Sequence, residues 1–555
     1  MQTLRITDPT PPSKPASRID PSSMLPDNWN VARDVLLIVG EGACEIAQPF
    51  IDHGLQRVIT MYPPPVAPEP ETPGAIRILN RAELTETLRS FSTGYPKQYA
   101  VIITPQCSLE PHITQSIKER IGNLLLTLPG KWYPPWKLTN HWALNGTANQ
   151  RNLEQLPMVQ DIGDAFAGVP VVIVGSGPSL GKNIHLLKEA QDKCIILCVN
   201  RALRSLQREG IWPDIAINIE TQDVECQFAD IDLDRIPGLF LSSTSHPPLF
   251  DLKGPKIFSY AGRMKRQGWM FNSEKMATPT DGISVACAAM TVAIQLKCDP
   301  IILVGQDLSF AGGNYYHSNG ADGDAKAVWD KVNNCWQLTN YSDDLAHTLK
   351  GNMPVDGPRY NATEVPGYYG GMVPTSAQFA GFRYFLQGAA VDHIGLIKMY
   401  NCTEGGARIG GMKHEPLQQA LQRLPTRSID VRAVLNEPRI EQMADARRPQ
   451  IKEQFEKNRE AVRLAYAQSK RVIEMIDESL QLGKLVAGVN QLASQLASNF
   501  IANHLVRLLA PHDLARAIDA ERKATSTTQA LQASRMLYST MHEQLSRVIA
   551  ADSTD

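Results

Sequence analysis

Several features that would assign this chain to a familiar class are missing from its sequence. None of its nine cysteines forms a C-x-x-C pair, so neither a zinc knuckle nor a dithiol redox motif is indicated. Residues 1–15 contain no apolar run of the kind that a signal peptide carries. The most apolar helical stretch, Ser284 to Leu296, is too short to cross a bilayer and includes Thr291 and Gln295. We therefore predict a cytoplasmic protein with no membrane insertion.

An excess of charge of one sign is also lacking. With 55 Lys and Arg against 57 Asp and Glu, the formal net charge is −2, which provides no overall attraction for nucleic acid or anionic membranes. The chain has 555 residues, of which 43% are hydrophobic and 20% charged, a balance typical of globular proteins. This length predicts two to four domains. The charge balance predicts no nucleic-acid partner.

Strand and helix patterns alternate along the first half of the chain. Buried-strand patterns occupy residues 34–39, 57–61, 99–104, 171–174, 194–199, 214–219, 238–242, 256–259 and 301–304, and helix patterns include 178–191, 201–208 and 282–296. This alternation predicts an α/β fold with a mostly parallel, doubly wound central sheet covered on both faces. Residues 310–411 are rich in Gly, Asn, Tyr and Thr, so we expect loops and short elements there.

Beyond residue 425 the pattern becomes helical. A seven-residue rhythm is kept by Ile451, Phe455, Val462, Ala465, Val472 and Ile476. Gly483 ends that stretch, and further helix patterns reach residue 549, which predicts an antiparallel bundle that packs or binds a partner helix. The predicted organisation is a flexible arm (1–29), a small Rossmann-like domain (30–155), a larger α/β domain (156–425) and a helical bundle (426–555).

The strand at 171–174 runs into the turn Gly175-Ser176-Gly177-Pro178-Ser179. Glycines allow a sharp turn, and Pro178 suits the first helical position. The free N–H groups and the helix dipole favour an anion, to which the serine hydroxyls can also donate. The turn therefore predicts a nucleotide-phosphate site, although a βα connection that binds nothing has the same pattern. Leu180 replaces the third glycine of G-x-G-x-x-G, and no Walker lysine pattern is present.

A second glycine turn, Gly40-Glu41-Gly42, follows the strand at 34–39. Glu41 would repel a phosphate, so we interpret this turn as structural.

Polar residues follow other strands of the predicted sheet. Asn200 ends one strand, Asn218 to Glu220 the next, and Gly305-Gln306-Asp307 another. Carboxyl ends of parallel strands meet at one edge, so these side chains should converge on the Gly175 turn. For Asp307 the alternative is a helix N-cap.

Several motifs resemble, in order and spacing, the motility-associated factor (Maf) glycosyltransferases. They are Gly175 to Leu180, Cys198 to Arg201, Thr280-Asp281-Gly282 before an alanine-rich helix, Gly305 to Ser309, His317-Ser318, Val365 to Gly371 with Thr375, and Asn401 to Ile409. The resemblance covers roughly residues 165–415. It implies transfer of a nonulosonic acid, such as pseudaminic or legionaminic acid, from its CMP-activated form to Ser/Thr hydroxyls of flagellin, as flagellum assembly and motility require.

The core of that family is similar to bacterial sialyltransferases that use CMP-sialic acid. The comparison implies that Gly175 to Ser179 and Asn200 face the nucleotide. Asn218, Glu220 and Gln306, at neighbouring strand ends, are further candidate contacts of the nucleotide sugar. Thr280-Asp281-Gly282 matches a Ser/Thr-Ser-Gly turn, from which Asp281 departs. Phe310 stands where a phosphate-binding tyrosine is common, so Tyr315 or Tyr316 must supply that hydroxyl.

The remaining roles are assigned to a few residues. His317, on a loop that we expect to be exposed enough to meet substrate, is the candidate base, with Asp307 as a further catalytic candidate and His414 as a second choice. Arg408, aided by Thr403, is the predicted clamp on the sugar carboxylate, and Glu404 and Gly405 are further candidate contacts of the nucleotide sugar. Asp322-Gly323-Asp324 spells D-x-D, but the related sialyltransferases do not depend on a metal, so neither a metal nor a permanently bound cofactor is predicted.

Two other functions fit parts of the sequence. The same region resembles archaeal-type hydroxymethylpterin diphosphokinases, which would make the ligands ATP and a pterin; those proteins lack the helical tail and the segment from Thr403 to Arg408. A flagellin-holding chaperone with a vestigial pocket is the non-enzymatic alternative.

Overall fold

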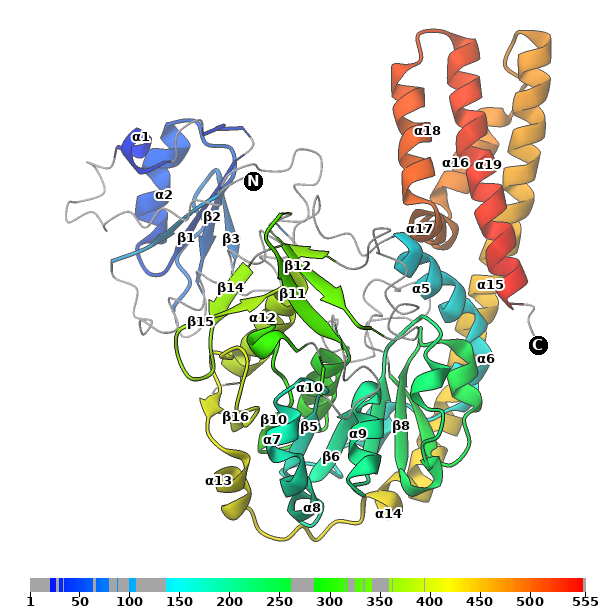
Figure 1. Ribbon diagram of the computed structural model, residues 1–555. Helices are drawn as coiled ribbons and strands as arrows, with labels where there is room; N and C mark the ends of the chain where they lie inside the picture. Colours follow the sequence, from blue (N-terminus) through cyan, green and yellow to red (C-terminus); the bar gives the residue numbers. More distant parts are fainter. Residues whose placement is uncertain are drawn as a thin grey trace. The chain divides into compact units, whose positions relative to one another are not determined.

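The computed structural model describes residues 20–25, 29–32, 34–62, 66–78, 87, 99–105, 136–260, 284–314, 316–317, 325–332, 335–341, 359–361, 363–393 and 395–552. The chain divides into two compact units, residues 1–133 and 134–555 (Figure 1). The division falls before the expected boundary at residue 155. Helices α5 (Trp136–Ala148) and α6 (Gln150–Gln155) therefore belong to the second unit, where both contact the long helix of the bundle or its neighbours.

The first unit contains a four-stranded sheet of order β3-β2-β1-β4. Its strands are β1 (Val35–Val39), β2 (Val58–Met61), β3 (Ala75–Ile78) and β4 (Tyr99–Ile103), all parallel, with helices α1 (Pro21–Met24) and α2 (Ala43–Asp52). The predicted strands at 34–39, 57–61 and 99–104 are confirmed to within one residue at each end. Most of the predicted arm, residues 1–29, lies outside the described residues.

The glycine turn before α2 is occupied by an acid of the same unit. The Glu69 carboxylate accepts hydrogen bonds from the backbone N–H groups of Gly42 and Cys44, the latter at 3.1 Å. Burial alone would raise the pKa of Glu69, but these backbone donors outweigh it and lower that pKa. An internal carboxylate therefore fills the place where a phosphate would bind, which agrees with a structural interpretation of this turn.

The second unit is built on an eight-stranded sheet in which every pairing is parallel. The strand order is β17 (Lys413–His414), β16 (Met399–Asn401), β10 (Ile301–Val304), β5 (Val171–Val174), β6 (Ile195–Val199), β7 (Ile215–Asn218), β8 (Gly238–Ser242) and β9 (Lys256–Tyr260). The predicted parallel sheet is thus confirmed. Strands run outward from β5 in one direction through β9, and β10 lies on its other side, so the topological switch point falls between β5 and β10.

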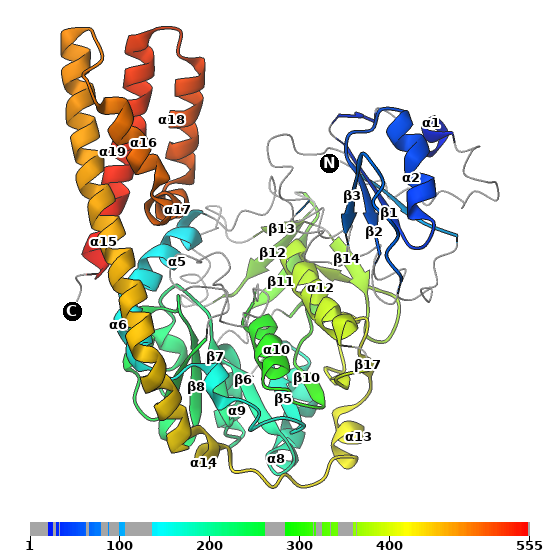
Figure 2. The same cartoon turned by 180° about the vertical axis from the view of Figure 1, so that it is seen from behind.

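Helices cover both faces of this sheet, because its strands are apolar on both sides. Val172 and Val174 join one buried cluster with α7 (Leu180–Asn183), α8 (Leu187–Ala190) and α9 (Leu203–Arg208), whereas Val171 and Ile173 join another with α10 (Val285–Gln295) and α12 (Ala377–Asp392). Figures 1 and 2 show these layers from opposite sides. The single helix predicted at 178–191 is instead α7, a 3-10 turn (Ile184–Leu186) and α8.

The region predicted to be loops contains more regular structure than its composition indicates. It holds β11 (Lys326–Asp330), β12 (Cys335–Thr339) and β13 (Arg359–Asn361), which pair antiparallel, and the hairpin of β14 (Thr363–Pro366) and β15 (Met372–Thr375). It also holds the 16-residue helix α12. Gly381 and Gly388 hide that helix in the sequence, but the Ser376 side chain caps it by accepting the Phe379 N–H at 3.0 Å.

The bundle consists of α15 (Pro438–Leu482), α16 (Val489–Ser498), α17 (Phe500–Leu509), α18 (Pro511–Lys523) and α19 (Thr527–Asp552). Asp477 pairs with Arg535, Ser469 with His542 and Arg459 with Asp552, so α15 and α19 run antiparallel, as predicted. The six residues of the predicted seven-residue rhythm are all buried, and Gly483 ends α15 in the left-handed conformation. Among the described helices, none has the length and apolar character that a bilayer crossing needs.

The shorter elements connect these layers. They are α13 (Leu417–Gln422), α14 (Val431–Leu435) and 3-10 turns at Val159–Ile162, Asn200–Ala202, Glu225–Gln227, Leu233–Arg235, Pro247–Asp251 and Ala311–Gly313.

Candidate functional site

The turns that follow β5 and β10 meet at the switch point of the large sheet. The Gly175 N–H donates to Val304 O at 2.8 Å, and the Gly177 N–H donates to Gly305 O at 2.9 Å. A Cβ on Gly175 would lie 2.6 Å from Gly305 O and would collide with the Gln306 side chain. A Cβ on Gly177 would lie 2.7 Å from the same oxygen and would collide with the Asp307 side chain. Both glycines are therefore required because two turns pack directly against each other.

Asp307 occupies the start of the helix that follows the glycine turn. Its carboxylate accepts the Ser179 hydroxyl at 2.8 Å and the Ser179 backbone N–H at 3.2 Å. Burial raises the pKa of Asp307 to about 6, although the bonds from Ser179 and the charge of Lys182 act in the opposite direction. The backbone N–H and hydroxyl of Ser179, two of the donors that were predicted to hold a phosphate, are thus engaged by Asp307.

The predicted segment from Thr403 to Gly405 closes over the same place. Thr403 Oγ1 accepts the Gln306 N–H at 3.1 Å, and the Ala407 N–H donates to Asp307 O at 2.7 Å. A Cβ on Gly405 would lie 2.9 Å from the Ser179 Cβ. Residues from three distant parts of the chain therefore form one compact edge. The meeting of the Gly175 turn with Gly305 to Asp307 was predicted from their position after parallel strands, whereas β16, which precedes Thr403, was not a predicted strand.

Unpaired polar atoms gather at this edge. Gln306 Nε2, Asn183 Oδ1 and Asn401 Nδ2 are buried and have no hydrogen-bond partner among the described residues. Asn183 is anchored through its amide to Cys402 O at 2.8 Å, and Asn401 Oδ1 accepts the Thr403 N–H at 3.1 Å. Buried polar groups without partners are rare in folded proteins, so they mark a place where a ligand or water completes the bonding.

His317 lies behind the turn rather than on an exposed loop. The residue is 3% exposed. Its backbone N–H donates to Ser176 O at 3.0 Å, and its ring Nδ1 lies 3.3 Å from Ser205 Oγ. Burial lowers the pKa of the imidazole, so His317 is neutral near pH 7. The expectation that it is exposed enough to meet substrate is wrong, because the chain after β10 folds back and packs His317 against α7 and α9.

The predicted ligands after β6 and β7 bond to their own surroundings, except that the buried Asn218 Nδ2 has no hydrogen-bond partner among the described residues. Asn200 is buried and donates to the Gln227 side chain, and Asn218 Oδ1 accepts the Glu220 N–H at 2.6 Å.

Helix α5 secures the loops after β7 and β8. Its Asn145 amide donates to Thr221 O at 2.8 Å, and the amide of Asn149, which follows α5 and precedes α6, donates to Ser245 O at 2.9 Å. The carboxyl ends of β7 and β8 are therefore held by a helix of the same unit.

Arg408 and His414 form a group of their own. Arg408 is exposed, and its carbonyl accepts the Arg383 Nε–H. Burial, assisted by the charge of Arg408, lowers the pKa of His414 to about 4. The His414 Nε2 accepts the Ile409 N–H at 3.1 Å, so this imidazole is a poor candidate for the base. The Arg408 charge acts on His414, and no contact of its side chain with the Gly175 turn is found in the described part of the chain.

Tyr316 lies beside His317, and the Arg201 guanidinium lies 5.0 Å from the centre of its ring. The predicted residues Thr280, Asp281, Gly282 and Tyr315, and the D-x-D acids Asp322 and Asp324, lie outside the described residues.

Sequence patterns missed two residues at this edge, Lys182 and Tyr369. Lys182 Nζ donates to Glu404 O at 2.7 Å and lies 5.7 Å from the centre of the Tyr369 ring. Lys182 follows Ser179 by three positions, a spacing that places both on one helical face and could have revealed it. Tyr369 lies in the motif Val365 to Gly371, which the sequence singled out only through its resemblance to the Maf family.

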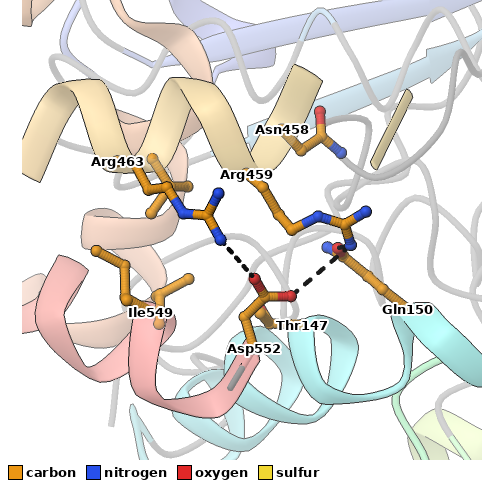
Figure 3. A pocket seen from close by; sticks show the side chains of 9 residues that line it. Thr147, Gln150, Asn458, Arg459, Arg463, Ile549 and Asp552 are labelled. Atoms are coloured by element: carbon orange, nitrogen blue, oxygen red, sulfur yellow. Dashed lines mark hydrogen bonds and ion pairs between the residues drawn. The ribbon is translucent and has the colours of Figure 1, made fainter. Parts of the chain in front are cut away.

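Two further groupings lie elsewhere in this unit. Asp223, Glu225 and His246 have potential ligand atoms within 4.8 Å of one another, but the acids are exposed and nothing else points to a metal. Figure 3 shows a pocket lined by Arg459, Arg463 and Asp552; the two guanidinium groups lie 3.8 and 3.9 Å from the Asp552 carboxylate. Glu154 and Glu456 also pair with Arg459, so this pocket has no excess positive charge for an anion.

Comparison with known proteins gives two similarities. A family model described as 6-hydroxymethylpterin diphosphokinase MptE-like matches residues 145–313, which include every strand from β5 to β10. The solved structure of the MAf glycosyltransferase from Magnetospirillum magneticum AMB-1 is similar at 15% sequence identity and a TM-score of 0.44, covering 93% of this chain and 74% of that one. No curated protein sequence matches the chain.

Proposed function

We propose that this protein is a glycosyltransferase that moves a nonulosonic acid of the pseudaminic or legionaminic type from its CMP-activated form to Ser/Thr hydroxyls of flagellin. The observation that carries the proposal is the convergence of three motifs at the switch point. These are the segments 175–180, 305–309 and 401–408, the same segments whose order and spacing resemble the Maf family. Ligands of doubly wound sheets bind at this point of the fold.

The reaction needs three aids from the protein. An acceptor hydroxyl oxygen attacks the anomeric carbon, the bond from that carbon to the phosphate oxygen breaks, and CMP leaves with the bonding electrons. The hydroxyl proton passes to a base. The transition state resembles an oxocarbenium ion, so stabilising the leaving phosphate and positioning the sugar carboxylate both lower the barrier.

We assign the proton transfer to Asp307 in place of His317. Asp307 lies at the switch point, and burial raises the pKa of its carboxyl to about 6, so it is ionised near neutral pH yet more basic than an ordinary aspartate. Its bond to the Ser179 hydroxyl orients the carboxylate. His317 packs behind the turn and supports its backbone through Ser176 O.

The test is transfer to unmodified flagellin, measured by the intact mass of flagellin after incubation with CMP-pseudaminic or CMP-legionaminic acid. We expect the mass to increase by whole nonulosonic acid residues with one of the two donors. Asp307→Asn should reduce the rate about 100-fold or more, the range that general-base groups supply. Asp251→Asn, which changes an exposed acid of the same unit, is the control. No mass increase with either donor would contradict the proposal, and flagellin binding without transfer would favour the chaperone.

The second candidate function is an ATP-dependent diphosphokinase acting on a hydroxymethylpterin. The match of the family model to residues 145–313 favours it. Thermal-shift measurements with CMP, ATP and S-adenosylmethionine separate the two functions, since a shift with ATP and none with CMP would support the kinase.

A further inference from the structure

The leaving phosphate needs positive charge that the glycine turn does not supply. The backbone N–H and hydroxyl of Ser179 donate to Asp307. The Gly175 and Gly177 N–H groups donate to the carbonyl oxygens of Val304 and Gly305, at the end of β10. Bringing a phosphate to this edge therefore requires a cation nearby, because the buried acid Asp307 would otherwise repel it.

Lys182 is placed to supply that charge. It lies on α7 one turn after Ser179, is exposed, and has its ammonium group held by Glu404 O at 2.7 Å. An ammonium group has three N–H donors, so within the described residues two remain for a ligand. A Cβ on Gly405 would lie 3.6 Å from the Lys182 Nζ and 3.5 Å from Asp307 Oδ1, so the ammonium group and the acid both approach this glycine.

Tyr369 adds an aromatic surface next to this charge. It is 75% exposed, yet its hydroxyl donates to Glu404 O at 3.0 Å and its ring packs edge-on against Tyr368, with centroids 4.8 Å apart. An exposed ring fixed at its hydroxyl has a free face at low entropic cost, which suits stacking of a base.

The tip of the β14–β15 hairpin is itself fixed above the switch point. The Tyr368 N–H donates to Gly406 O at 2.8 Å, and the Tyr368 hydroxyl donates to Asn401 O and Glu415 O, each at 3.1 Å. The hairpin tip and the segment after β16 therefore form one rigid unit. The Tyr369 ring and the Lys182 ammonium share the Glu404 carbonyl as their common anchor.

The acids around Lys182 are accounted for by other partners. The Glu404 carboxylate accepts the Leu417 N–H at 3.0 Å and lies 3.4 Å from Asn183 Nδ2, and Asp307 is bonded to Ser179. Neither acid forms an ion pair with the ammonium group among the described residues. The charge of Lys182 is therefore available to a ligand at the exposed side of the edge.

We propose that Lys182 and Tyr369 bind the nucleotide part of the donor, with the ammonium group on the phosphate and the base stacked on the exposed ring. This inference rests on the proposed function only in taking the ligand to be a nucleotide. It replaces the glycine turn as the phosphate contact and leaves that turn as the structural floor of the site.

The test is calorimetric titration of the full chain with CMP, with cytidine and with ATP. For wild type we expect CMP to bind and cytidine to bind more weakly. Lys182→Gln should weaken CMP binding about tenfold and leave cytidine binding unchanged, since one charge-assisted contact is lost. Tyr369→Ala should weaken both about tenfold, whereas Tyr369→Phe, which keeps the ring, should remain within about threefold of wild type.

The controls are Lys188→Gln on α8 and Met372→Ala on β15, which change an exposed lysine and an exposed apolar residue of the same unit. Thermal unfolding of each variant verifies that it is folded. Equal CMP binding by Lys182→Gln and Lys188→Gln would overturn the proposal, as would a chain that binds neither nucleotide. If wild type binds ATP but not CMP, and the two variants weaken ATP binding, the nucleotide site stands and the CMP-sugar function falls.

Discussion

The carboxylate of Asp307 accepts hydrogen bonds from both the backbone N–H and the hydroxyl of Ser179, a residue 128 positions earlier in the chain. This pair joins the ends of β5 and β10, the two strands on either side of the switch point. The acid is deeply buried and carries a raised pKa, so the edge of the sheet holds a group that is costly to ionise. Such a cost is typical of a functional residue rather than of a stabilising one.

The first prediction concerns Asp307 and pH. The unfolded chain ionises this carboxyl near pH 4, whereas burial raises its pKa in the folded protein to about 6. The folded state therefore binds the proton more tightly, and the corresponding stability is present below about pH 4 and lost as the pH rises through 6. Asparagine has no proton to lose. The free energy of unfolding of Asp307→Asn should rise relative to wild type between pH 4 and 7, by at most about 3 kcal/mol. Urea unfolding at several pH values checks this, with Asp251→Asn, a change at an exposed acid, as the control.

The second prediction concerns Gly177. A Cβ there would lie 2.7 Å from Gly305 O and would collide with the Asp307 carboxylate. Gly177→Ala should therefore lower the free energy of unfolding by about 1–3 kcal/mol, because the two turns cannot separate without breaking the bonds between them. The adjacent Ser176→Ala should change it by less than about 0.5 kcal/mol. Equal stability of the two variants in urea would show that the turns are not packed as described.

The third prediction separates structure from chemistry at His317. Burial lowers the pKa of this imidazole, so protonation favours the unfolded chain, and the protein loses stability as the pH falls below about 6.5. His317→Gln should remove part of this acid sensitivity. If the variant folds, its transfer rate at pH 7.5 should stay within about tenfold of wild type, less than the loss of a base causes. A rate at the level of Asp307→Asn, with unchanged thermal stability, would return the role of base to His317.

The fourth prediction concerns the attachment of the long helix α15 to the 3-10 turn Val159–Ile162. Arg447 binds both carboxylate oxygens of Asp161, at 2.5 and 2.6 Å, and the Asp161 side chain is 1% exposed. Arg447→Leu leaves that acid buried without its partner and should cost about 3–5 kcal/mol. The neighbouring Arg448 pairs with Asp445 at the surface, so Arg448→Leu should cost about 1 kcal/mol or less. Urea unfolding of the two variants, side by side, measures the difference.

The sequence by itself determined the longer buried strands, the parallel sheet they form and the bundle, since each depends on the local order of apolar residues; it missed β3 and the strands from β11 to β17. Buried parallel strands are apolar runs, and the rhythm from Ile451 to Ile476 is a property of one helix. It also predicted which strand ends meet, because topology places carboxyl ends at one edge.

Only the tertiary structure decided what those strand ends do. Asp307 occupies the donors of Ser179, His317 turns inward against Ser205, and Lys182 shares the Glu404 carbonyl with Tyr369. Each of these contacts joins residues far apart in the chain. Whether a hydroxyl, an imidazole or an ammonium group is paired or available depends on such long-range packing, which local patterns of residue type do not record.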